Sequence, residues 1–209
     1  MGPRSVDRAQ KRNRLLEAAA KVFSERGFKR TTMAEVARRA DVGKGTVYEY
    51  FESKESLFLE LLDWYCSVSL QAAAPSGGEK ATATESLKAF GQDTVRLMLE
   101  NWDLFPLSME FWSEASQTRQ REGLFKVMKG MYEGYRSVVV AILRAGQASG
   151  EFRKGLDLEA LATMVVGGFD GMFLQYHFDP SLDPAAIADR FMEVFIEGIR
   201  TKKGKANHA

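Results

Sequence analysis

Apolar residues recur at helical spacing along almost the whole chain, and no segment shows the alternation of a β-strand. An early stripe combines Leu15, Ala19, Val22 and Phe23, and Gly27 follows it as a stop signal. The pattern predicts an all-α fold of about nine helices. We expect them at residues 7–26, 33–40, 44–51, 54–73, 82–100, a short segment beginning near 106, 118–149, 158–178 and 184–200, with a loop at 74–78 and a loose polar tail at 201–209.

Two of the short helices are expected to be joined by a tight turn. Thr32 and Glu35 have the spacing of a capping box, in which the hydroxyl and the carboxylate satisfy free backbone N–H groups at a helix start. The first helix stops at residues 41–43, and its apolar face would pack on Val47 and Phe51 of the second helix. The opposite surface of the second helix is cationic, hydroxylated and aromatic.

That second helix has the residue types that bind a DNA backbone. Lys44 lies at its start, where free N–H groups and the positive end of the helix dipole favour an anion. Gly43 and Gly45 have no side chain to keep a sugar-phosphate strand away. Hydroxyl donors to phosphate oxygens follow at Thr46, Tyr48 and Tyr50, and Lys54 opens the next helix. Few residues that could read base edges are present, so these contacts would fix register on the duplex.

The same region resembles a known family through the run Thr31-Thr-Met-Ala-Glu-Val-Ala37 and the run Asp41-Val-Gly-Lys-Gly-Thr-Val-Tyr-Glu-Tyr-Phe-Glu-Ser-Lys54. It is similar to the N-terminal helix-turn-helix of the tetracycline-repressor (TetR) family of ligand-responsive transcriptional regulators, and the likeness covers roughly residues 14–62. Residue types and resemblance together predict a DNA-contacting set of Thr32, Gly43, Lys44, Gly45, Thr46, Tyr48, Tyr50 and Lys54. Two departures are Gly43, where a capping serine is frequent in the family, and Tyr50, where histidine is frequent.

Positive charge is concentrated at the N-terminal end of the chain. Residues 1–54 contain 13 Lys and Arg and 7 Asp and Glu, whereas the rest contains 16 and 21, so the net charge of +1 hides a basic end. Five basic residues precede or open the first helix, namely Arg4, Arg8, Lys11, Arg12 and Arg14. They could form a flexible arm that reaches an adjacent minor groove, or merely a solubilising tail.

The single cysteine, Cys66, cannot form an internal disulfide, which is compatible with a reducing cytoplasm. The first residues lack an apolar signal region, and no apolar run approaches the ~18 residues of a membrane span. We therefore expect a soluble cytoplasmic protein with no membrane partner, no cofactor, no metal and no catalytic site.

We expect a DNA-binding domain at residues 8–68 and a ligand-binding and dimerisation domain at residues 69–209. Seven of the nine methionines and 18 of the 23 aromatic residues follow residue 54. Such side chains suit an adaptable apolar cavity, although at helical spacing they also suit a plain core. The resemblance implies a ligand pocket in this part, and the candidates for its lining are Trp102, Phe105, Met109, Trp112, Phe125, Met128, Phe169, Asp170 and Phe173.

Asp170 lies within an otherwise apolar run and has three possible settings. It could face solvent, pair with an arginine such as Arg96 or Arg136, or point into the cavity. In the cavity it would select cationic or hydrogen-bond-donating effectors.

The last two helices have the features of a subunit interface. Gly167, Gly168 and Gly171 each sacrifice ~1 kcal/mol of helix propensity, which indicates close helix approach. The predicted strip on this helix is Leu161, Val165, Gly168 and Met172, and the matching face of the last helix is Ile187, Phe191, Val194 and Phe195. The resemblance implies a four-helix bundle between two subunits. Two-fold symmetry also suits helix-turn-helix proteins, whose recognition helices meet major grooves about 34–36 Å apart.

These features lead to the hypothesis of a homodimeric repressor that binds a pseudo-palindromic operator in double-stranded DNA. An apolar or aromatic small-molecule effector of unknown identity would release it, with the helix from Lys54 to about Ala73 as the coupling element. The alternative is a ligand-indifferent DNA-binding protein. An enzyme is a remote alternative, because the carboxylate pair Glu110 and Glu114 lacks a nearby histidine pattern and suits a solvated helix face better.

Overall fold

A computed structural model of the chain describes residues 3–72, 81–117 and 122–201. Within those ranges it contains nine α-helices and one short 3-10 helix, which confirms the expected all-α fold. None of the helices in these ranges is both long and apolar enough to cross a membrane. The loop expected at 74–78, the start of the long helix expected at 118–121 and the tail expected at 202–209 lie outside the described residues.

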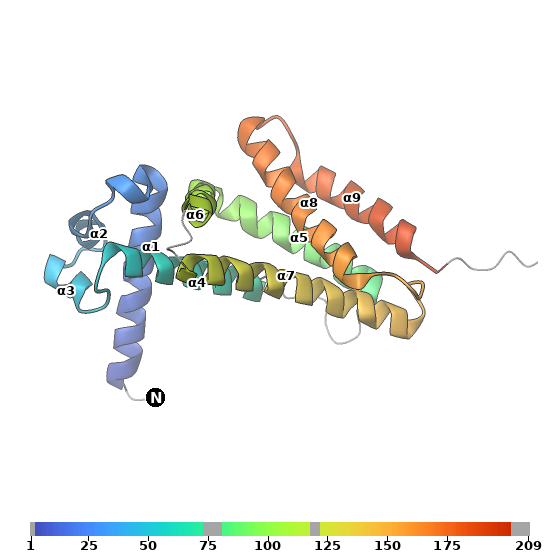
Figure 1. The fold of residues 1–209 in the computed structure, drawn as a ribbon, viewed down its shortest axis with the longest axis horizontal. Helices are drawn as coiled ribbons and strands as arrows, with labels where there is room; N and C mark the ends of the chain where they lie inside the picture. The colour runs from blue at the N-terminus through green and yellow to red at the C-terminus, as the bar shows by residue number, and fades with distance from the viewer. Residues whose placement is uncertain (1–2, 73–80, 118–121, 202–209) are drawn as a thin grey trace, which may run out of the picture. The chain divides into compact units, whose positions relative to one another are not determined.

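The chain groups into two compact units, and the helices that belong to them are labelled in Figure 1. The first contains Met1–Val68 and Asn101–Met131, and the second contains Ser69–Glu100 and Tyr132–Ala209. One boundary between the units falls near residue 68, where we placed the domain boundary, but the described residues between 101 and 131 group with the N-terminal unit and not with the C-terminal one. The division by function into 8–68 and 69–209 stays a prediction.

The first unit contains α1 (Pro3–Arg30), α2 (Met33–Arg39), α3 (Lys44–Tyr48), the start of α4 (Lys54–Ala72), η1 (Trp102–Leu104), α6 (Phe105–Gln117) and the start of α7 (Glu122–Ser149). Its core includes an aromatic cluster. The ring of Phe58 lies 5.0 Å from that of Phe23 and 4.7 Å from those of Phe28 and Phe111, between centroids. Because these rings come from α1, α4 and α6, the cluster joins the three helices.

Gly27 ends the first helical segment, as predicted: φ is 76° and ψ is 163° there, and a second short helical segment follows it to Arg30. The two segments together are α1, which begins at Pro3 instead of near residue 7. A residue with a Cβ rarely adopts that conformation. Arg4 also belongs to the helix, as Arg8 to Arg14 were expected to, so these residues do not form the flexible arm that was one of the two alternatives.

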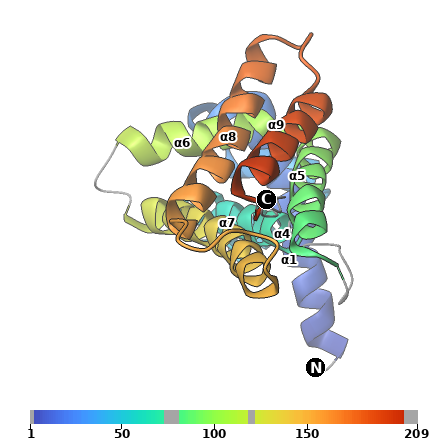
Figure 2. The same cartoon turned by 90° about the vertical axis from the view of Figure 1, so that its right-hand side faces the viewer.

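The second unit contains α5 (Ala83–Glu100), the larger part of α7, α8 (Leu158–Phe178) and α9 (Pro184–Ile199). Figures 1 and 2 show α5 and α9 side by side, and α9 also packs on α8. An added Cβ on Gly91 of α5 would lie 3.0 Å from Met192 and 3.4 Å from Phe169. The three helices therefore approach one another closely at this point.

The predicted helix starts of this unit are confirmed. The Thr82 hydroxyl accepts a hydrogen bond from the Glu85 N–H at 3.2 Å, and the Glu85 carboxylate accepts one from the Thr82 N–H at 2.8 Å. Asp157 and Asp183 are the N-caps of α8 and α9, and the carboxylate of each accepts bonds from backbone N–H groups of the first turn. These starts depend only on neighbours two or three residues away.

The loop after α7 connects three helices of the second unit. Glu151 accepts bonds from the backbone N–H groups of Ala83 and Thr84 at 3.0 and 3.1 Å, and so caps α5. The adjacent Phe152 is buried and forms a backbone bridge to the end of α9. An added Cβ on Gly146 of α7 would lie 2.1 Å from the Phe152 ring, so glycine is needed there.

Candidate nucleic-acid interface

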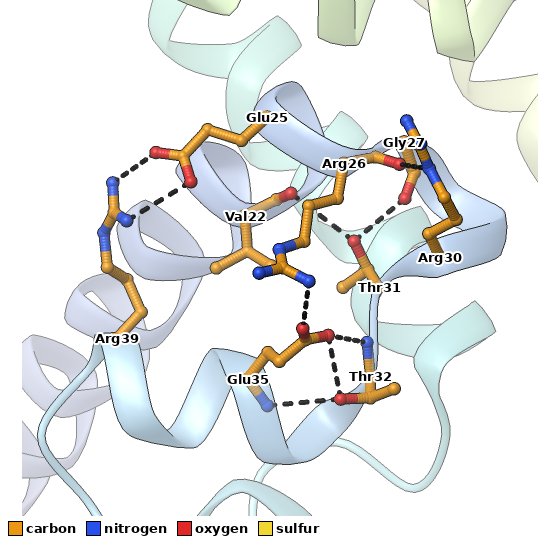
Figure 3. A network of polar contacts seen from close by, with 9 residues as sticks. All are labelled: Val22, Glu25, Arg26, Gly27, Arg30, Thr31, Thr32, Glu35 and Arg39. Carbon is orange, nitrogen blue, oxygen red and sulfur yellow. Dashed lines mark hydrogen bonds and ion pairs between the residues drawn. The ribbon is translucent and has the colours of Figure 1, made fainter.

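The capping box predicted at the start of α2 is present (Figure 3). The Thr32 hydroxyl accepts a bond from the Glu35 N–H at 3.3 Å, and the Glu35 carboxylate accepts one from the Thr32 N–H at 2.9 Å. Bonds from the side chain and then the backbone of Thr32 lower the pKa of the Glu35 carboxyl. Arg26 of α1 pairs with the same carboxylate at 2.5 Å. The first turn of α2 is therefore well defined and tied to α1.

Two further contacts hold α2 against α1 (Figure 3). The buried hydroxyl of Thr31 donates a bond to the carbonyl oxygen of Gly27 at 2.9 Å. At the other end of α2, Arg39 pairs with Glu25 at 2.6 Å. The orientation of α2 is consequently fixed at both of its ends.

One acidic and one basic side chain bind backbone groups of α1 just after Gly27. The N–H of Phe28 donates to Glu110 of α6 at 2.8 Å. The ammonium of Lys54, the first residue of α4, donates to the carbonyl oxygens of Phe28 and Lys29 at 2.9 and 3.4 Å and lies 4.5 Å from the centroid of the Phe28 ring. The predicted phosphate contact of Lys54 thus competes with an internal role, which makes it the weakest member of the predicted set.

The carboxylate pair of α6 does not lie on a solvated face. Glu114 is only 6 % exposed, and half-buried Glu110 is occupied by the backbone of α1. The expectation of a solvated face is therefore wrong. In the described part of the chain, no group of three or more His, Cys, Asp or Glu side chains could hold a metal ion.

The turn before α3 is short and specific. Asp41 adopts a positive φ of 54°, which aspartate tolerates better than most residues, and Gly43 is the N-cap of α3. As predicted, Val47 and Phe51 are buried, at 0 % and 1 % exposed. Their burial fixes which side of α3 faces outward.

The outward side of α3 carries most of the predicted DNA-contacting residues. Gly43, Lys44 and Gly45 are exposed, Tyr48 is 46 % exposed, and Thr46 and Tyr50 are half-buried. The Lys44 ammonium lies 5.8 Å from the centroid of the Tyr48 ring. An added Cβ on Gly43 or Gly45 would meet no atom within 4 Å, so internal packing does not require glycine at either position.

Two arginines of α1 also reach this region, which was not predicted from the sequence. The guanidinium carbon of Arg8 lies 5.7 Å from the centroid of the Tyr50 ring. Arg12 lies 5.5 Å from the centroid of the Phe51 ring and pairs with Glu60. Their four-residue spacing on a helix was the available signal.

Residues 15–61 match the model of the family described as bacterial regulatory proteins, tetR family, and residues 83–200 match that of the C-terminal part of BetI-type transcriptional repressors. The chain belongs to the TetR family. It is a ligand-responsive, DNA-binding transcriptional regulator, as the resemblance in the sequence predicts.

Relatives in the family cover most of the chain. The fatty acid metabolism regulator protein of Bacillus subtilis (strain 168) is 26% identical over 189 residues, which are 90% of this chain and 95% of the relative. An HTH-type transcriptional regulator of Mycobacterium bovis is 32% identical over 162 residues, which are 78% and 79%. The crystal structure of FadR from Bacillus subtilis in complex with stearoyl-CoA matches with a TM-score of 0.73 at 25% identity, covering 90% of this chain and 98% of that chain. These relatives are transcriptional regulators.

The predicted pocket residues are distributed over both units of this TetR-family protein. Trp102, Phe105, Met109, Trp112, Phe125 and Met128 belong to the first unit, and Phe169, Asp170 and Phe173 belong to the second. Phe105, Met128, Phe169 and Phe173 are buried, but Phe125 is 62 % exposed and does not line an enclosed cavity. The role of the set in binding a ligand stays a prediction.

Asp170 is half-buried in the second unit. Burial raises the pKa of its carboxyl to about 6, although a hydrogen bond donated by the Tyr132 hydroxyl acts in the opposite direction. One proposed partner, Arg96, pairs instead with Asp93 at 2.9 Å and Glu100 at 3.4 Å. Asp170 is thus a largely desolvated acid with a tyrosine partner, a setting that the sequence did not suggest.

The predicted interface residues divide between the surface and the core of the second unit. Gly168, Ile187, Phe191 and Val194 are exposed, and Leu161 and Phe195 are half-buried. The interface prediction is wrong for Val165 and Met172, because both are buried within the protomer, at 0 % and 8 % exposed, and point into its core. A shallow open groove follows α9 and is lined by Asp183, Ala186, Ile187, Arg190, Phe191 and Val194.

Proposed function

We propose that this chain binds a pseudo-palindromic operator as a homodimer and leaves the operator when an apolar or aromatic effector binds. The exposed face of α3 carries the DNA-binding part of the proposal. Lys44 and Tyr48 supply donors there, and the open space at Gly43 and Gly45 would admit a sugar-phosphate strand. Such a role would place the protein in the cytoplasm.

The exposed face of α8 and α9 supports the homodimer. Met164 of α8 and Val194 of α9 are 70 % and 66 % exposed, an unusual setting for large apolar side chains. An added Cβ on Gly167 or Gly171 in the middle of α8 would meet no atom within 4 Å, so packing within the protomer does not require glycine at either position. A second copy that packs closely on this face would explain both observations.

Relatives and composition support an apolar effector. The Bacillus subtilis relative is named as a regulator of fatty acid metabolism, and the similar FadR structure contains stearoyl-CoA, which has a long apolar chain. In this chain the buried Phe169 and Phe173 flank Asp170, whose raised pKa reflects surroundings that disfavour negative charge. Long-chain acyl-CoA is therefore the first effector class to test.

The salt dependence of DNA binding tests the proposal. An operator would be selected from genomic fragments, and its affinity measured over salt concentrations of about 50–200 mM. Lys44→Ala should weaken binding to the operator and to an unrelated duplex alike, and make the slope of log affinity against log salt shallower by about 1 per subunit. Lys88→Ala is the matched control, because this exposed lysine lies on α5 in the second unit, outside the predicted DNA-contacting set, and the slope should not change. An unchanged slope for Lys44→Ala contradicts the assignment of α3.

The ligand-indifferent alternative is separated by titration. Acyl-CoA of increasing chain length, free fatty acids and aromatic compounds would be added to the operator complex, and release followed by fluorescence anisotropy. Release by one class at micromolar concentration supports the proposed effector class. Undisturbed complexes with every compound would favour a DNA-binding protein that does not respond to these ligands.

A further inference from the structure

We propose that Arg8 of α1 is a further phosphate-binding residue and that the ring of Tyr50 holds it in place. The proposal rests on the proposed DNA-binding function. It extends the contacting surface beyond α2 and α3 to the first turns of α1.

The position of Arg8 is defined by α1 and by the segment that follows α3. The first turns of α1 are helical, so Arg8 is attached to a regular element. Its guanidinium carbon lies 5.7 Å from the ring centroid of Tyr50, two residues beyond the end of α3. One turn later Arg12 lies over Phe51. One face of α1 therefore runs along Tyr50 and Phe51, the residues that follow α3.

A guanidinium over an aromatic ring retains its capacity to bind phosphate. A guanidinium can stack its flat face on an aromatic ring, and its five N–H donors then point outward in the plane of the group. The side chain of Arg8 is exposed, so these donors are accessible. A phosphate can accept two of them at once, and the ring reduces the freedom that a long side chain would lose on binding.

Neighbouring cations on the same helix have different settings. Arg12 is one turn away, but its charge is compensated by an ion pair with Glu60. Lys11 is exposed and has no aromatic contact among the described residues. Arg8 thus combines an accessible charge with a fixed position, and Arg12 and Lys11 each share only one of these properties.

Salt-dependent binding to the full-length protein tests this assignment with a matched pair of variants. Arg8→Ala should make the slope of log affinity against log salt shallower by about 1 per subunit, on the operator and on an unrelated duplex equally. Arg12→Ala should leave the slope unchanged. No change for Arg8→Ala, or equal changes for the two variants, would overturn the proposal, since equal changes indicate only a diffuse effect of charge. If Lys44→Ala still lowers the slope in that case, only the role of Arg8 is lost.

A double-mutant cycle tests the part played by the ring. Tyr50→Ala removes the platform, and Tyr50→Phe retains it without the hydroxyl. We expect Arg8→Ala to reduce affinity less in the Tyr50→Ala background than in the wild type, and by the full amount in the Tyr50→Phe background. Additive effects in the Tyr50→Ala background would overturn the role of the ring. Circular dichroism of every variant, including those at half-buried Tyr50, checks that the fold is retained.

Discussion

The exposed face of α3 in the first unit and the exposed face of α8 and α9 in the second share one feature and differ in chemistry. Both contain glycines where an added Cβ would meet nothing, Gly43 and Gly45 on one and Gly167 and Gly171 on the other. Lysine, threonine and tyrosine surround the first pair, whereas large apolar side chains are exposed near the second. The unused space is therefore polar in one unit and apolar in the other, as DNA and a second protein copy would respectively require.

Two other glycines show that the role of a glycine depends on what surrounds it in the folded structure. Gly146 is packed against the Phe152 ring, and Gly27 has both a positive φ and the Glu110 carboxylate 3.3 Å from its would-be Cβ. These two glycines are required by the protomer itself. In the sequence they look no different from the glycines at the two surfaces.

The largest effect is expected from a charged substitution on the exposed apolar face of α8 and α9. Gly168 is exposed, and its would-be Cβ lies 3.6 Å from the Phe191 ring, so an arginine fits the protomer but places a charge on the proposed interface. We expect Gly168→Arg to yield folded monomers in analytical ultracentrifugation, with operator binding lost. Gly130→Arg, at an open position on α7, should remain dimeric. A normal Gly168→Arg dimer would place the interface elsewhere.

A second pair of variants separates required glycines from dispensable ones. Gly146→Ala should lower the free energy of unfolding by about 3 kcal/mol, because its Cβ would overlap the buried Phe152 ring. Gly130→Ala in the same helix should raise it by about 0.5–1 kcal/mol through helix propensity. Urea denaturation followed by circular dichroism measures both. Equal changes would show that space in the protomer does not explain the glycines.

Asp170 should make the stability of the second unit fall as the pH rises, whereas the lowered pKa of Glu35 in the first unit acts in the opposite direction. Burial raises the pKa of Asp170 from 3.8 to about 6 in the folded chain, so the folded state retains the proton more strongly than the unfolded state. The contribution of the protonated Asp170 carboxyl to the free energy of unfolding is therefore fully present below about pH 4. It is lost as the pH rises through about 6. Asp170→Asn should flatten that decline and add on the order of 2 kcal/mol at pH 7. Parallel profiles for the two proteins would contradict the burial of this carboxyl.

The smallest effect compares the same motif in both units. Thr32→Ala and Thr82→Ala each remove the hydroxyl of a capping box, and each should cost about 1 kcal/mol of stability. Only Thr32→Ala should also weaken operator binding, because α2 leads into α3, the helix proposed to contact DNA. Thermal unfolding and operator affinity are measured for both variants. A similar loss of affinity in Thr82→Ala would indicate that general destabilisation is responsible.

Features that depend on short stretches of chain could be predicted from the sequence. Both capping boxes, the N-caps Asp157 and Asp183, and the inward side of α3 follow from residues a few positions apart. The resemblance to the TetR family likewise depends on a short continuous stretch of sequence, and the matches to the two family models confirm it. Local hydrogen bonds and helical spacing involve neighbours in sequence, so the sequence alone determined them.

Only the tertiary structure decided which side chains were left over for a partner. Lys54 stays a predicted phosphate contact, but the structure adds internal partners for its ammonium, the carbonyl oxygens of Phe28 and Lys29 in α1. Val165 and Met172 shared a stripe with Gly168 but are buried, and Arg8 became part of the α3 region through Tyr50. In each case the deciding neighbour lies far away in the sequence or on another helix, and periodicity on one helix cannot specify what packs against it.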